Sequence, residues 1–213
     1  GCTALLVTGF GVRDSVSDIV SLQYDELNQY QLTLGLADSS ALEGRDLQSI
    51  LADSTQITDS LPAMQQEVEV VPADGKPADS VVLLVPQEVE SMPEYFQFRH
   101  RTNEQEVTFD QSSVIVTEKL CERQGWKVGD TITLENADGE QAQLTLTDIC
   151  ENYVYHYIYI SPQTYQDAFG QEMEVNSLLC KLPQDITAEQ EETLGTQLLQ
   201  CRDVVTAQFT NTL

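Results

Sequence analysis

The first third of the chain alternates between strand-like and helix-like patterns of apolar residues. Residues 30–36 place an apolar side chain at every second position, which predicts a half-buried strand. Ser40 and Glu43 have the spacing of a capping box, which predicts the start of a helix with apolar residues on its inner face. Residues 66–71 and 81–85 predict two further strands, and the unbroken apolar run of the second favours a central position in a sheet.

The end of the chain repeats part of this order. Residues 176–182 predict a strand, Thr187 and Gln190 predict a capping box at the start of a helix, and residues 204–209 predict a last strand. Units of strand, helix and strand usually pack into one α/β layer, and the chain between them is then an insertion. Two such units stand at the two ends of the sequence: Tyr30–Val71 and Asn176–Phe209.

The middle of the chain reads instead as a series of short strands. Its elements are predicted to be strands at 95–100 and 113–116, a helix from Thr117 to a stop at Gly125, a hairpin with its turn at Asn136–Gly139, a strand at 153–160, and a helix capped by Ser161 with Pro162 at its first position. We therefore predict an α+β protein of two lobes. An α/β lobe takes residues 1–94 and 170–213, and a β-rich lobe takes residues 95–169.

The opening segment has a separate character, because Gly1–Val12 carries no charge and the helical pattern then becomes amphipathic from Arg13 to Leu27. Twelve residues are too few to cross a hydrocarbon core about 30 Å thick. Gly9 and Gly11 weaken a helix in water, and no basic region precedes the run, which disfavours a signal peptide. The end of a membrane helix fits residues 1–12 best. A buried core helix is the alternative.

Charge limits the classes of partner. The chain has 10 Lys and Arg against 35 Asp and Glu, which gives a net charge of −25. Such a surface repels the phosphates of nucleic acids, so we expect no nucleic-acid partner. The hydrophobic content of 41% is too high for a disordered chain, and we expect a folded domain.

The five cysteines are an odd number and contain no C-x-x-C pair, which argues against a zinc ribbon, a redox motif and a disulfide scaffold. Cys180 ends a predicted strand and Cys201 follows the next predicted helix, so a single bridge between them stays open. Buried free thiols are the favoured state, because free cysteine packs as a small hydrophobic residue.

Motifs of catalysis are missing from the sequence. It holds no nucleophile elbow, phosphate-binding loop, zinc-protease helix or dinucleotide fingerprint. His100 and His156 show no spacing that would bring them together, and the Asp-Gly turns at Asp74 and Asp138 lack the preceding ligands of a calcium loop. We therefore expect no enzyme activity of its own, no cofactor and no metal.

The tyrosines between residues 153 and 159 form an unusual alternating pattern. Tyr153, Tyr155, Tyr157 and Tyr159 alternate with other residues, so that a strand would carry four tyrosines on one face. Tyrosine combines apolar area with a polar tip, which suits a partner surface or a peptide groove. Packing of this face against the neighbouring lobe is the alternative.

We interpret Trp126 as a core residue beside a turn.

Four segments resemble, in their order along the chain, the extracytoplasmic part of FtsX-like permeases of the MacB type. Residues 1–20 look like the end of a first membrane helix that runs into its extracellular stalk, which implies a membrane segment at 1–12 and a stalk helix at 13–27. Residues 114–134 resemble a segment of strand, short helix, Gly-x-x-x-Gly-Asp turn and strand. Residues 151–165 are similar to the segment that follows in the long permeases of Firmicutes, a Gram-positive group. Residues 204–213 are similar to the segment that leads to the second membrane helix of the family.

The resemblance implies a Porter-like α/β lobe and an inserted Sabre-like lobe, on the extracellular side of the cell membrane. It implies that ATP is hydrolysed by a separate cytoplasmic ABC ATPase and that membrane helices transmit the motion to this domain, a process called mechanotransmission. A second permease copy or pseudo-repeat, and an extracellular peptide, lipoprotein or cell-wall partner, would complete the assembly. Two other functions stay open: a free-standing secreted protein that binds a peptide or glycan, and, least favoured, a hydrolase.

Overall fold

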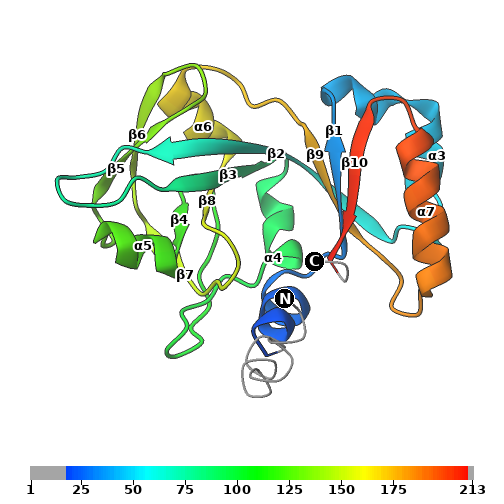
Figure 1. Ribbon diagram of the computed structural model, residues 1–213, viewed down its shortest axis with the longest axis horizontal. Coiled ribbons are helices and arrows are strands. Elements are labelled where there is room, and N and C mark those ends of the chain that lie inside the picture. The colour runs from blue at the N-terminus through cyan, green and yellow to red at the C-terminus, as the bar shows by residue number, and fades with distance from the viewer. Residues whose placement is uncertain (1–17, 211–213) are drawn as a thin grey trace, which may run out of the picture.

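One mixed β-sheet runs through the molecule from end to end (Figure 1). The computed structural model describes residues 18–210. Within that range the strands follow the order β10-β1-β9-β2-β3-β8-β4-β7, and β5 and β6 form a hairpin attached to the end of β2. The sheet with its covering helices confirms the predicted α+β class.

The elements in chain order are η1 (Leu22–Leu27), β1 (Leu32–Leu36), η2 (Ser39–Glu43), α3 (Arg45–Leu51), β2 (Asp59–Val70), β3 (Ser80–Pro86), η3 (Val89–Ser91), α4 (Met92–Tyr95), β4 (Val114–Thr117), α5 (Glu118–Gln124), β5 (Thr131–Glu135), β6 (Gln141–Thr145), β7 (Asp148–Cys150), β8 (Tyr157–Ile160), α6 (Pro162–Phe169), β9 (Ser177–Lys181), α7 (Ala188–Gln200) and β10 (Val204–Phe209).

The two predicted strand-helix-strand units interlock at one end of the sheet. β1 lies between β9 and β10 and is antiparallel to both, while β9 also pairs with β2. β1 and β2 are therefore parallel with β9 between them, which is the split βαβ arrangement. Helices α3 and α7 pack together with these strands (Figure 1) around a core that includes Leu32, Leu34, Leu47, Leu178, Leu194 and Leu198. The two units therefore share one α/β layer, as predicted.

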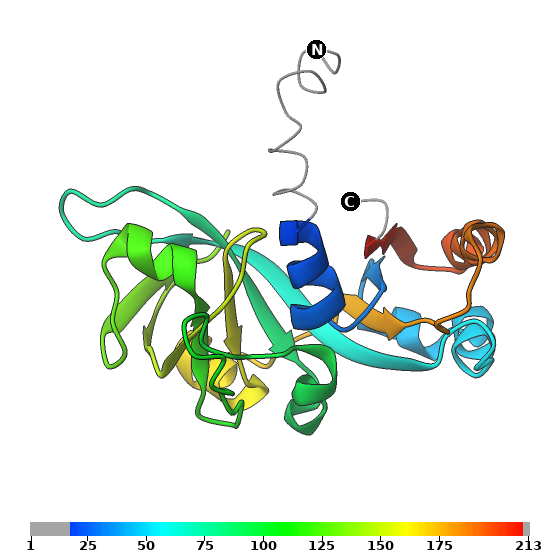
Figure 2. The ribbon, with the colours of Figure 1, turned by 90° about the horizontal axis from the view of Figure 1, so that it is seen from below.

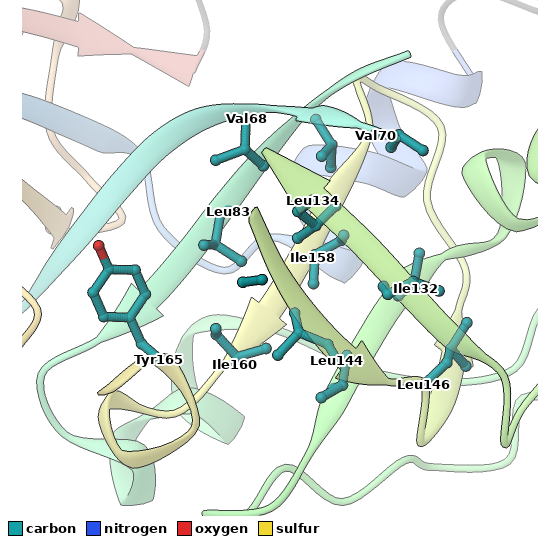
Figure 3. Packing of buried hydrophobic residues seen from close by; sticks show 14 of the residues in the cluster. Val68, Val70, Leu83, Ile132, Leu134, Leu144, Leu146, Ile158, Ile160 and Tyr165 are labelled. Atoms are coloured by element: carbon teal, nitrogen blue, oxygen red, sulfur yellow. The ribbon is translucent and has the colours of Figure 1, made fainter. Parts of the chain in front are cut away.

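The opposite end of the sheet is the β-rich part. β3 pairs with β2 and, in parallel, with β8, and β4 lies between β8 and β7. Figure 3 shows the aliphatic core formed there by Val68, Val70, Leu83, Ile132, Leu134, Leu144, Leu146, Ile158, Ile160 and Tyr165. β2 and β3 thus pack with the inserted segment, although the boundary at residue 94 assigns them to the other lobe. The lobe boundaries themselves stay a prediction.

A third core, rich in aromatic rings, lies between these two. Phe96 contacts Tyr30 at a centroid distance of 5.4 Å and Tyr159 at 5.1 Å. Phe98 packs beside Phe96 at 5.6 Å and Phe109 beside Phe98 at 5.8 Å. The aromatic cluster joins β1 and β8 to the chain after α4.

Two local predictions are wrong. Ser40 and Glu43 form no capping box: the Asp38 carboxylate accepts the Ser40 backbone N–H at 2.8 Å, which starts the short helix η2, and α3 begins only after Gly44. Residues 95–100 form no strand: Tyr95 ends α4, Phe96 and Arg99 form only isolated bridges, and the aromatic side chains of this segment lie in the central core.

Other local signals are confirmed. Thr187 and Gln190 form a reciprocal capping box, and the Ser161 hydroxyl accepts the N–H of Thr164. Gly125 ends α5 with a φ of 71°, and Gly139 turns the β5–β6 hairpin with a φ of 81°. Trp126 is half-buried against the aliphatic core, as predicted.

Helix η1 and the end of β10 lie side by side on one side of the molecule (Figure 2). The Thr210 backbone N–H donates to the Gln31 carbonyl at 3.0 Å. The proposed membrane segment at residues 1–12 and the first part of the proposed stalk lie outside the described residues. Within residues 18–210, no helix is both long enough and apolar enough to span a bilayer.

Candidate functional site: a tyrosine-lined cavity beside the first helix

The predicted stripe of four tyrosines is wrong in part. β8 begins at Tyr157, so only Tyr157 and Tyr159 share a strand face, where their rings stack at 5.6 Å. Tyr159 is buried in the aromatic core. Tyr155 lies in the preceding loop with a φ of 60° and is 70% exposed. Tyr153 also lies in that loop, and its hydroxyl donates to Glu151.

The loop conformation has a clear cause. The Asn152 side chain donates to the carbonyls of Val154 and Tyr155, both at 2.9 Å, which turns the chain where a strand was predicted. The backbone N–H groups of Tyr153 and Val154 meanwhile donate to the Gln23 side chain of η1. The side chains of Asn152 and Gln23 therefore form hydrogen bonds with backbone groups that would pair with a neighbouring strand if residues 153–155 were extended.

The loop, helix η1, the sheet and the end of β10 enclose a cavity of about 250 Å³. The stripe contributes Tyr155 and Tyr157 to it. The whole lining consists of Tyr24, Asn28, Tyr30, Thr33, Gln65, Val82, Val154, Tyr155, Tyr157, Gln208 and Thr210. These residues come from the beginning, middle and end of the described chain, and none of them is charged at neutral pH.

Four of the lining residues are tyrosines: Tyr24, Tyr30, Tyr155 and Tyr157. Within residues 18–210, no hydrogen bond uses any of their four hydroxyl groups, although Tyr30 as a whole is only 7% exposed. Burial raises the pKa of Tyr30 well above its ordinary value and raises the pKa of Tyr157 to about 12. Burial also raises the pKa of Tyr24, with a smaller contribution from Tyr155. Tyr24, Tyr30 and Tyr157 therefore present protonated hydroxyls at neutral pH.

Helix η1, one wall of the cavity, is held by a buried glutamine. Gln23 is 1% exposed; its side-chain oxygen accepts from Tyr153 N at 2.7 Å and from Val154 N at 3.2 Å, and its nitrogen donates to Asn28 Oδ1 at 3.2 Å. The six residues of η1 form a π-helix, which is rare in proteins and is frequently found at functional sites. Gln23 therefore sets the position of the helix against the loop.

A buried cation forms the second link of η1 to the β-rich part. Arg99 Nε donates to Glu151 Oε1 at 2.7 Å, and Arg99 also contacts Glu26 of η1 at 3.3 Å. The hydrogen bond to Glu151 raises the pKa of Arg99 above its ordinary value. The Tyr153 hydroxyl shares the Glu151 carboxylate, and burial together with this bond raises its pKa to about 12.

A second cavity, of about 300 Å³, lies near β7 and is lined in part by His100, Arg101, Glu118 and Asp148. Its charged groups are paired with one another: His100 Nε2 lies 2.8 Å from Asp148, and Arg101 Nε lies 2.9 Å from Glu118. Among residues 18–210, no cluster of three or more His, Cys, Asp or Glu side chains could hold a metal ion. The pairing of these charges leaves the first cavity as the better candidate site.

Sequence reasoning found two of the four tyrosines of the cavity. It missed Tyr24 and Tyr30, since each stands alone in its segment and no local pattern marks it. It left the pairing of Cys180 and Cys201 open, and both are buried free thiols in the structure.

No family model matches the chain, and no curated protein matches it. Among solved structures, the periplasmic region of MacB from Actinobacillus actinomycetemcomitans is similar, with 11% identity, a TM-score of 0.47, and coverage of 87% of this chain and 91% of that one. The extracellular domain of the noncanonic ABC-type transporter YknZ from Gram-positive bacteria is also similar, with 8% identity, a TM-score of 0.46, and coverage of 84% and 98%.

Proposed function

We propose that this chain is the extracellular domain of an ABC transporter permease subunit and couples the motion of membrane helices to a partner or substrate outside the cell. One observation carries the proposal: η1 and the end of β10, far apart in sequence, lie side by side at one side of the molecule (Figure 2). A domain suspended between two membrane helices needs both connections on the side that faces the membrane.

The contacts of η1 support the coupling step. Gln23 and Arg99 fasten the helix to the loop and to the chain of the β-rich part. On the other side, Gln31, which follows η1, accepts from Thr210 and donates to the Cys180 carbonyl at 3.0 Å. A displacement of η1 would therefore pull on both ends of the sheet.

The proposed partners are those that the resemblance to FtsX-like permeases suggests. ATP hydrolysis would belong to a cytoplasmic ABC ATPase, and a second permease copy or pseudo-repeat would stand beside this one. The extracellular partner would be a peptide, a lipoprotein or a cell-wall component. We propose no catalytic role for the domain, because the charged side chains of its second cavity are already paired.

Cysteine labelling in cells tests the location. In the complete gene product, with Cys2 replaced by Ser, Asp138→Cys places a thiol on the exposed turn of the β5–β6 hairpin, while the four cysteines among residues 18–210 are buried. A membrane-impermeant maleimide should label this variant in intact cells, with the label in the membrane fraction. Labelling only after lysis would contradict the proposal, and a labelled protein released into the medium would favour a free-standing binding protein.

Fluorescence tests the coupling. An environment-sensitive fluorophore on Asp138→Cys in the assembled transporter should respond to ATP. Gln23→Leu should abolish this response while ATP hydrolysis continues, because the link between η1 and the loop is lost. Gln29→Leu is the matched control, since its side chain bonds only within the same segment, to the Glu26 carbonyl. An unchanged response in Gln23→Leu would refute the coupling role of η1.

A further inference from the structure

We propose that the tyrosine-lined cavity binds one neutral sugar ring, such as a hexose or N-acetylhexosamine unit of a glycan. This inference goes beyond the proposed function and does not depend on it, because it rests on the size, the charge and the unpaired hydroxyls of the cavity. The aromatic core behind it and the loop in front of it give the site fixed walls.

Size restricts the occupant to a small group. The cavity of about 250 Å³ falls just below the range of roughly 300–1,000 Å³ that is typical of sites for drug-sized ligands. It is larger than the space of a few waters, each of which occupies about 30 Å³ in the liquid. A single six-membered ring with its substituents is smaller than a drug-sized ligand and larger than a few waters, so it fits this volume.

The unpaired hydroxyls favour a hydrogen-bonding ligand. Within the described chain, the hydroxyls of Tyr24, Tyr30 and Tyr157 have no hydrogen-bond partner, and none of them is closed off from water. A ligand that displaces water from the cavity loses affinity unless it replaces the hydrogen bonds of that water. A phenol is protonated at neutral pH, so each of the three can donate as well as accept.

The rest of the lining adds the complementary groups. Asn28, Gln65 and Gln208 bring amides, which offer both donors and acceptors, and Thr33 and Thr210 bring hydroxyls. The phenol rings add apolar faces. A sugar ring has the matching pattern, since hydroxyls surround its edge and C–H groups cover its faces.

Charge excludes other classes of ligand. No charged side chain lines the cavity, so a carboxylate, phosphate or ammonium group would lose its hydration without a counter-ion. The net charge of −25 further disfavours anions. A purely apolar ligand would leave the three phenol hydroxyls without partners. The tyrosine or phenylalanine side chain of a peptide is the rival occupant, and the experiment separates it from a sugar.

Ligand titration by NMR on the 213-residue chain tests the proposal. The probes are glucose and N-acetylglucosamine, their charged relatives glucuronate and glucosamine, and p-cresol as a mimic of a tyrosine side chain. A ligand of about 12 non-hydrogen atoms should bind with a dissociation constant of about 1–10 mM. One of the two neutral sugars should bind in this range and shift the signals of Tyr30 and Tyr157, and the charged relatives should bind at least about tenfold more weakly.

Hydroxyl deletions locate the binding. Tyr30→Phe and Tyr157→Phe should each weaken sugar binding about two- to tenfold, while the melting temperature stays unchanged because neither hydroxyl has a partner in the fold. Tyr165→Phe is the control, since its hydroxyl contacts Gln66 and Gln171 away from the cavity. Binding of p-cresol without binding of either sugar, or no binding of any probe, would overturn the proposal. Equal binding by wild type and both variants would overturn it as well. The labelling experiment is independent of these outcomes.

Discussion

Arg99 and Glu151 form a buried ion pair in which Nε donates to Oε1 at 2.7 Å, and the two side chains are only 11% and 5% exposed. The pair lies where three segments meet, because Glu26 of η1 contacts the same guanidinium and Tyr153 shares the same carboxylate. Together with Gln23, the pair therefore helps to hold the first helix to the β-rich part.

Removal of the guanidinium should destabilise the domain strongly. Arg99→Ala leaves the buried Glu151 carboxylate without its cation, and breaking a buried pair from one side costs about 3–5 kcal/mol. Chemical denaturation of both proteins measures the difference. Arg101→Ala is the matched control: Arg101 is half-exposed in its pair with Glu118, so its loss should cost much less than the loss of Arg99. Equal effects of the two substitutions would contradict this account.

Loss of the Gln23 amide should loosen the loop before β8. Gln23→Leu keeps the apolar volume but leaves the N–H groups of Tyr153 and Val154 without an acceptor, at a cost of about 1–3 kcal/mol for each that stays buried. Hydrogen exchange should become faster at these two amides, whereas the amides of β3 should keep their protection. Unchanged exchange at Tyr153 would show that the glutamine does not hold the loop.

Much of the fold could be predicted from the sequence, because its signals are local. The alternation of residues 30–36, the capping box at Thr187 and the glycine turn at Gly139 each depend on neighbours within a few residues, and each is confirmed. The shared layer of the two terminal units followed from the general packing of such units, whereas the pairing of β9 between β1 and β2 did not.

The cavity could be predicted only in part, because its geometry depends on distant contacts. Tyr153 and Tyr155 have the alternation of a strand, but the side chains of Gln23 and Asn152 take up the backbone groups that a strand would use. Tyr30 and Tyr157 line one cavity, although three strands separate β1 from β8 in the sheet. No pattern in one segment carries that information.

The four cysteines among residues 18–210 should react only after unfolding. All four are buried free thiols, and burial raises the pKa of Cys121 to about 12, which keeps it in the unreactive thiol form. In a Cys2→Ser variant, an aromatic disulfide reagent should therefore titrate no thiol quickly in buffer and four in denaturant. Only two reactive thiols in denaturant without reductant would indicate a disulfide and contradict the structure.

Stability should fall as the pH drops below about 6.5, in part because of His156. Burial lowers the pKa of His156, and Arg123 and Lys119 lower it further, while Asp79 opposes them. At a pH between the folded pKa and the ordinary value of about 6.5, the unfolded state therefore binds more protons at His156 than the folded state does. The contribution of neutral His156 to the free energy of unfolding is complete above about pH 6.5, and it is lost as the pH falls through the folded pKa. His156→Asn should show a flatter decline in the free energy of unfolding between pH 7 and 5. His100 is present in both proteins, so the difference between the two curves isolates His156. Parallel curves for wild type and variant would show that His156 titrates alike in both states.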